Sequence, residues 1–266
     1  MTIPKRDYPA KPEAVYFYGT CLSDLFYSQS GLAAVEMLEQ EGVRVIYPPD
    51  QTCCGQPPFN SGYREEARQV ARNQMALFPK DIPVVVPSGS CGGMMAVHYP
   101  ELFAEAPAPE KTQAEQFAAR VFEWSDFMAN VLKASLVDQG PAVKVAYHPS
   151  CHLQREMNVR DAPLNLLGQL AQVEMVTLER ADECCGFGGT FSVKQEAISG
   201  AMVGDKQASI VASGAEILVS MDSGCLMNIG GALSKAGHNL RVMPLPLFLK
   251  ERVNGSTSST KAKGGE

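Results

Sequence analysis

Eight cysteines, arranged as two sets with nearly the same internal spacing, constrain this chain more than any other feature. Each set reads as a single cysteine, an adjacent pair and another single cysteine. The gaps are 32, 1 and 37 residues in the first set and 33, 1 and 40 in the second. The two sets are Cys21, Cys53, Cys54, Cys91 and Cys151, Cys184, Cys185, Cys225. This agreement indicates a duplicated unit.

The residues around the cysteines repeat as well. Each single cysteine follows an apolar run, and each pair precedes a glycine, Gly55 or Gly186. Short apolar runs rich in β-branched residues predict buried strands, with helical patterns between them. The predicted strands lie at about 15–18, 43–47, 82–86, 143–147, 173–177 and 216–220.

The alternation of strands and helices predicts an α/β fold made of two pseudo-symmetric, Rossmann-like halves with parallel sheets. We place the first half at 1–140, including a helical connector over 105–140, and the second at 141–253. Residues 254–266 are expected to form a disordered tail. Because ligand sites in open α/β sheets lie beyond the carboxyl ends of the strands, the loops of each half should gather four thiols.

Composition narrows the class of protein. A hydrophobic content of 45% allows a packed core, and a net charge of −6 disfavours a nucleic-acid binder. We find neither a secretory signal nor an apolar stretch long enough to span a membrane, so we expect a cytoplasmic protein. Cytoplasmic thiols stay reduced, and the cysteines therefore indicate metal or redox chemistry.

The adjacent cysteines help to choose the metal. Four thiolates suit either zinc or an iron–sulfur cluster. Structural zinc sites usually separate paired cysteines by about two to four residues, whereas adjacent Cα atoms are only ~3.8 Å apart. A cluster can bind each thiolate at a different iron. We therefore expect two [4Fe–4S] clusters, whose normal ligands are four cysteines, and keep zinc as the alternative.

Glycines and histidines accompany the cysteines. The glycines permit positive φ, which would let backbone N–H groups face a cluster. They are Gly55, Gly186, Gly188 and Gly189. We interpret the nearby histidines as hydrogen-bond donors behind the ligands or as surface residues, and Met94 as core. These histidines are His98, His148 and His152.

The doubled pattern resembles the cysteine-rich CCG-domain proteins, which include heterodisulfide reductase B and the iron–sulfur component of glycolate oxidase. The closer similarity is to the lactate utilization protein A family. It covers roughly 14–250 and is carried by the segments 53–57, 60–63, 148–151, 184–194, 198–200 and 225–229. The resemblance implies electron transfer during oxidation of L-lactate to pyruvate, with all eight cysteines as cluster ligands. It also implies two partners, a B-type ferredoxin-like iron–sulfur protein and a C-type protein.

One departure from the heterodisulfide reductase pattern matters. There the last element of each motif is Cys-x-x-Cys, but here Met94 and Asn228 occupy the final positions. Four ligands per site favour a simple [4Fe–4S] centre or a cluster with one iron open to another ligand. Two alternative functions stay open, a cluster-dependent thiol or disulfide reductase and a zinc-stapled binding module. Since no flavin or nicotinamide motif is evident, we expect one component of a complex rather than a complete enzyme, and we assign no catalytic residue.

Overall fold

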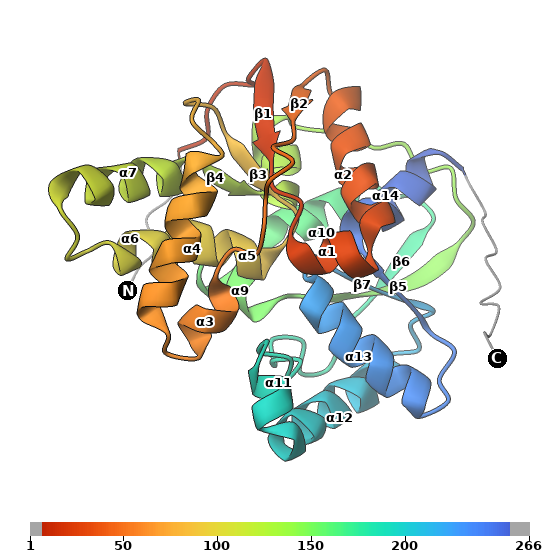
Figure 1. Ribbon diagram of the computed structural model, residues 1–266. Helices are drawn as coiled ribbons and strands as arrows, with labels where there is room; N and C mark the ends of the chain where they lie inside the picture. Colours follow the sequence, from red (N-terminus) through yellow and green to blue (C-terminus); the bar gives the residue numbers. More distant parts are fainter. Residues whose placement is uncertain (1–6, 256–266) are drawn as a thin grey trace.

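A computed structural model describes residues 7–255 of the chain, so the predicted tail lies outside the described residues except for its first two positions. Each half folds into a four-stranded parallel sheet with helices packed around it (Figure 1). The predicted α/β fold with two Rossmann-like halves is therefore confirmed. In the described part of the chain, no helix is long and apolar enough to cross a membrane.

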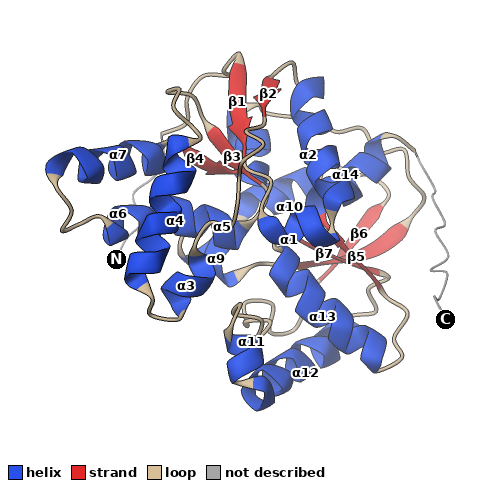
Figure 2. Ribbon diagram, viewed as in Figure 1, coloured by secondary structure: helices blue, strands red, loops and turns tan. Residues whose placement is uncertain are grey.

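The two sheets share one topology. The strand order is β2-β1-β3-β4 in the first half (Figure 2). In the second half it is β6-β5-β7-β8. The strands are β1 (Ala14–Phe17), β2 (Arg44–Ile46), β3 (Val84–Val86), β4 (Val121–Glu123), β5 (Val143–His148), β6 (Val173–Val176), β7 (Ile217–Ser220) and β8 (Arg241–Pro244). In each sheet the second strand in sequence lies on one side of the first strand, and the third and fourth strands lie on its other side. The order of the strands therefore reverses between β1 and β3, and between β5 and β7. The carboxyl ends of β1 and β3, and of β5 and β7, are therefore the expected ligand positions.

Helices connect the strands and cover the sheets. In the first half they are α1 (Cys21–Phe26), α2 (Ser28–Gln40), α3 (Gln56–Asn60), α4 (Arg64–Ala76), α5 (Gly89–Gly93), the π-helical turn η1 (Met94–His98), α6 (Tyr99–Leu102), α7 (Ala108–Ala119), α8 (Trp124–Asp126) and η2 (Phe127–Val131). In the second half they are α9 (Cys151–Arg155), α10 (Asp161–Leu167), α11 (Phe191–Lys194), α12 (Glu196–Ala212), α13 (Ser223–Lys235) and α14 (Leu245–Val253).

All six predicted strands are present, but the fourth strand of each sheet was not predicted. The segment 105–140, expected to be a helical connector, contains β4. This strand was missed because the apolar residues of α7 and Val121 together follow a helical spacing. The other missed strand, β8, ends at Pro244 and is followed by Pro246, residues that weaken a strand prediction. The duplication therefore extends to four strands per half.

One hydrophobic core belongs to both halves. It contains Val15 and Val85 from the first sheet, Val145 and Val219 from the second, and apolar side chains of α2, η2, α10 and α14. Figure 1 shows α2, α10 and α14 between the two sheets. Separate clusters cover the outer face of each sheet. The shared core holds the carboxyl ends of the two sheets in a fixed relation.

Candidate metal centre

All eight cysteines line a single cavity of about 320 Å³. The sequence analysis predicted two separate groups of thiols, one per half, and did not predict that both would face the same space. Each cysteine reaches the cavity from a loop or helix start that follows a strand, as the fold rule requires. The cavity therefore lies where the carboxyl ends of the two sheets meet.

Within this cavity the thiols of the first half form one quartet. Cys21 opens α1, the pair Cys53–Cys54 precedes α3, and Cys91 lies in α5. The side chain of Cys21 is within hydrogen-bonding reach of Cys53, Cys53 of Cys54, and Cys54 of Cys91. Loops that span 70 residues of sequence are thus brought together.

The second half repeats this arrangement. Cys151 opens α9, Cys184–Cys185 lie in the loop after β6, and Cys225 lies in the first turn of α13. The contacts again run from the first single cysteine through the pair to the last one. The structure therefore groups the eight predicted residues as two equivalent quartets.

In each quartet the first cysteine of the pair is held as a thiolate. Hydrogen bonds from Cys21 and then Cys54 lower the pKa of Cys53 to about 3. Hydrogen bonds from Cys151 and then Cys185 lower the pKa of Cys184 to about 2. The pKa of the neighbouring Cys21 is raised, first because its thiol donates to Cys53. Thiolate is the form of cysteine that binds metal, so the low pKa of this cysteine in each quartet suits a metal site.

Backbone N–H groups also face the sulfur atoms, as predicted. The amide of Gly186 donates to Cys184 Sγ over 3.4 Å. Gly186 has φ 82°, and a Cβ there would lie 2.8 Å from the Ser199 carbonyl oxygen. The other three glycines of the predicted set, Gly55, Gly188 and Gly189, also have positive φ. Glycine at position 186 is required both by the turn and by the close approach of α12.

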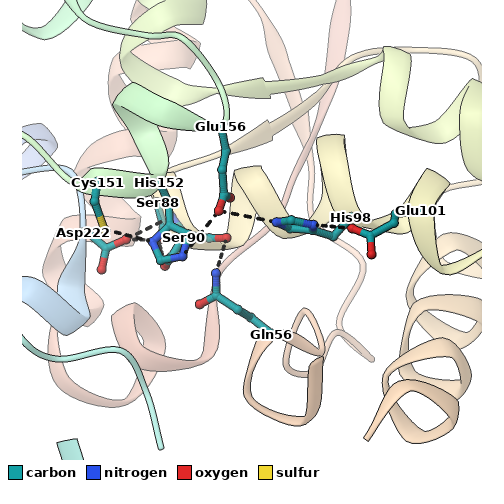
Figure 3. Close-up of polar contacts among 9 residues, drawn as sticks. All are labelled: Gln56, Ser88, Ser90, His98, Glu101, Cys151, His152, Glu156 and Asp222. Atoms are coloured by element: carbon teal, nitrogen blue, oxygen red, sulfur yellow. Dashed lines mark hydrogen bonds and ion pairs between the residues drawn. The ribbon is translucent and has the colours of Figure 1, made fainter. Parts of the chain in front are cut away.

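The three histidines lie in different environments. Figure 3 shows His152 beside Cys151, with Glu156 between His152 and His98. His98 is held by Glu156 and Glu101, which raise its pKa, and its ring centre lies 4.6 Å from that of Phe59 in a tilted arrangement, outside the cavity lining. His148, in contrast, is 1% exposed at the end of β5, among the second quartet.

Several polar contacts join the two halves at the cavity. Asp222 caps the start of α13 and also accepts from the amide of Ser90 over 2.9 Å and the hydroxyl of Ser88 over 3.3 Å (Figure 3). The hydroxyls of Ser23 and Ser223 lie 2.7 Å apart. Sequence reasoning missed Asp222, although an aspartate directly before the first residue of a helix is a recognisable capping signal.

Met94 and Asn228, which stand where the heterodisulfide reductase B pattern has a further cysteine in each half, do not line the cavity. Met94 is fully buried in the first-half core, as predicted. Asn228 donates its side-chain amide to the carbonyl of Cys185 over 2.8 Å and so steadies the cysteine pair. Each quartet is therefore left with four thiols.

The donor set fits a cluster better than a single ion. Four thiolates around one zinc lie ~3.8 Å from one another, given Zn–S bonds of ~2.3 Å. Among the described residues, the donor atoms that lie mutually within 4.8 Å belong to His148, Cys185 and Cys225, and neither quartet forms such a compact set. Eight soft thiols in two wider groups match the ligands of two iron–sulfur clusters.

Comparison with known proteins agrees with this description. The cysteine-rich CCG domain matches residues 15–96 and 145–230, one match in each half. The chain is 45% identical over 241 residues to lactate utilization protein A of an Exiguobacterium species, covering 90% of this chain and 98% of that protein. It is 44% identical over 238 residues to the protein of the same name from Geobacillus kaustophilus, covering 90% and 99%.

A solved structure shows the same fold at low sequence identity. It is the crystal structure of a hypothetical protein from Helicobacter pylori, 12% identical, with a TM-score of 0.63 over 94% of this chain. This chain spans 50% of the length of that protein. On the strength of the duplicated cysteine-rich domain and of relatives matched over nearly their whole length, this chain belongs to the lactate utilization protein A family of CCG-domain proteins.

Proposed function

We propose that the protein is the iron–sulfur electron-transfer component of a complex that oxidises L-lactate to pyruvate. Each quartet would hold one [4Fe–4S] cluster through its four cysteines. When bound, such a cluster stores and passes on single electrons, while the protein supplies ligation, burial and orientation. The lactate role rests on the relatives, which are named lactate utilization protein A.

The observation that carries the proposal is that both quartets face the same cavity. Two redox centres on one cavity would be close neighbours. Metal ions that served only to stabilise the fold would not need two sites that face the same cavity. The arrangement instead favours the passage of electrons from one site to the other.

Removal of a hydride from lactate would take place on a partner. The cavity is lined mainly by thiols, small hydroxyl residues and apolar groups, together with Gln56, His152 and Asp222. Gly186-Phe187-Gly188-Gly189 is not a dinucleotide-binding signature. We therefore propose that the chain works with a B-type ferredoxin-like protein and a C-type protein. The B-type protein would exchange electrons with this chain.

Anaerobic purification followed by iron and acid-labile sulfide analysis tests the first part. We expect about eight irons and eight sulfides per chain, since each cubane holds four of each, together with an electron paramagnetic resonance signal after reduction. A colourless protein with about two zincs would contradict it. For the second part, lactate should reduce the clusters when both partners are added, and should fail to reduce them with this chain alone.

A further inference from the structure

His148 is a buried polar side chain whose interactions the described residues do not satisfy. It ends β5, where its carbonyl accepts from the hydroxyl of Ser220 on the neighbouring strand. Neither ring nitrogen has a hydrogen-bond partner among the described residues. An unpaired polar group in the protein interior carries a cost of roughly 1–3 kcal/mol, so its presence calls for a physical explanation.

The ring of His148 lies against two cysteines of the second quartet. One of its nitrogens and the sulfur atoms of Cys185 and Cys225 lie within 4.8 Å of one another. Lys206, which also faces His148, is already bound to the carbonyls of Arg180 and Ala181. Asp222 and Cys184 complete the charged and titratable groups around the ring. Both carboxylate oxygens of Asp222 already accept hydrogen bonds, so the thiols are the acceptors that remain for the imidazole N–H.

The position of His148 relative to the cavity separates a ligand from a hydrogen-bond donor. All four thiols of the second quartet line the cavity, whereas His148 is not among its lining residues. The imidazole therefore lies behind the sulfur atoms, on the side away from the space that a cluster would fill. A group in this position can donate to sulfur without displacing a cysteine from iron.

Among its described residues, the first half has no equivalent donor. Tyr18 is the counterpart of His148 in the first half. Each residue lies three positions before the first cysteine of its quartet, at the carboxyl end of the first strand of its sheet. The Tyr18 hydroxyl is already used, since it donates to the carbonyl of Thr52 over 2.5 Å. An unpaired imidazole behind the sulfur atoms therefore distinguishes the second quartet from the first.

We propose that, when the second cluster is bound, His148 acts as a positioning residue that donates a ring N–H to the thiolate of Cys185 or Cys225 and raises the reduction potential of that cluster. The inference rests on the proposed function. A hydrogen bond to a cluster sulfur stabilises the reduced form, which carries one more negative charge, so losing the bond lowers the potential.

The test is a redox titration of the anaerobically purified chain, monitored by electron paramagnetic resonance, for the wild type, His148→Leu and His148→Gln. We expect His148→Leu to keep the full iron and sulfide content while one of the two potentials moves to more negative values. His148→Gln retains N–H donors and should restore part of the shift. His98→Gln is the matched control and should leave both potentials unchanged.

Each other outcome decides against the inference. Unchanged potentials in both His148 variants overturn it, and so does the loss of about half of the iron, which would make His148 a ligand. Thermal unfolding identifies a variant that does not fold, in which case the more conservative His148→Gln supplies the measurement. A wild-type chain without iron overturns the proposed function itself, and that result is recorded before any variant is compared.

Discussion

The two halves of this protein have the same topology and the same cysteine pattern, yet they differ in the polar groups behind the sulfur atoms. The first half places Tyr18 and Ser88 at positions where the second half has His148 and Asp222. Tyr18 is neutral and already bonded, whereas His148 is unpaired and Asp222 is a carboxylate. The duplicated scaffold thus repeats the ligands, while the residues behind them allow the two sites to differ in chemistry.

The largest expected effect comes from removing one ligand in each half. Cys54→Ser and Cys185→Ser should each reduce the iron content to about half, because a hydroxyl is a poor ligand for iron in a four-thiolate site. Each variant should retain the signal of the other half's cluster. Combining the substitutions should leave almost no iron. If either single change removed all iron, the two quartets would be holding one shared centre.

A buried ion pair tests whether the halves are stable independently. Arg252 of α14 makes two bonds to Asp138, in the segment that joins the halves, and both side chains are at most 6% exposed. Arg252→Met leaves the Asp138 carboxylate buried without its partner and should lower the free energy of unfolding by about 3–5 kcal/mol.

Denaturant unfolding of the Arg252 variant measures this loss. The control is Arg241→Met, which breaks a more exposed pair with Glu251 and should cost at most about 1 kcal/mol. Two separate transitions in the Arg252 variant would indicate that the pair couples the halves. Equal losses in both variants would contradict the prediction.

The ends of the fourth strands differ in a way that pH can reveal. Register places the fully buried Glu123 at the end of β4 where β8 has Pro244. Burial raises the pKa of Glu123 to about 7. The native state therefore binds more protons than the unfolded chain between the ordinary carboxyl pKa and about 7, so stability should fall as pH rises through this window.

The size of this effect follows from proton linkage. The slope is at most about 1.4 kcal/mol per pH unit. Glu123→Gln should remove it and can still cap α8 with its side-chain oxygen, which now accepts from Ser125 and Asp126. Unfolding measured at several pH values in wild type and variant checks the difference. Parallel curves would show that Glu123 is ionised in the native state at every pH tested.

The smallest expected effect concerns the contact between α5 and α9, which joins the two quartets. A Cβ on Gly89 would lie 2.7 Å from Leu153 Cβ and 3.0 Å from its backbone nitrogen. Gly89→Ala should therefore destabilise the protein by about 1–3 kcal/mol. Gly31→Ala in α2 meets nothing within 4 Å and should be neutral or stabilising by up to about 1 kcal/mol. Thermal unfolding compares the two, and an equal response would contradict the packing argument.

Much of this structure could be predicted from the sequence, because each half carries its own signals, namely short apolar runs and a repeated cysteine spacing. The apolar runs identified six strands, and the cysteine spacing identified both quartets. Two strands escaped notice because Val121 continues a helical spacing and Pro244 weakens a strand signal. The shared cavity could not be predicted, since a repeat describes each half but not how one half faces the other. The same is true of Asp222, whose contacts with Ser88 and Ser90 depend on that relation.

The common core has a consequence for the way such a protein is made. Helix α14, at the end of the described chain, packs against α2 near its beginning, and Lys250 pairs with Glu36 across this contact. Neither half can be completed by translation of its own residues alone. A gene split between the repeats would release two fragments, each exposing the apolar side chains that it contributes to the common core.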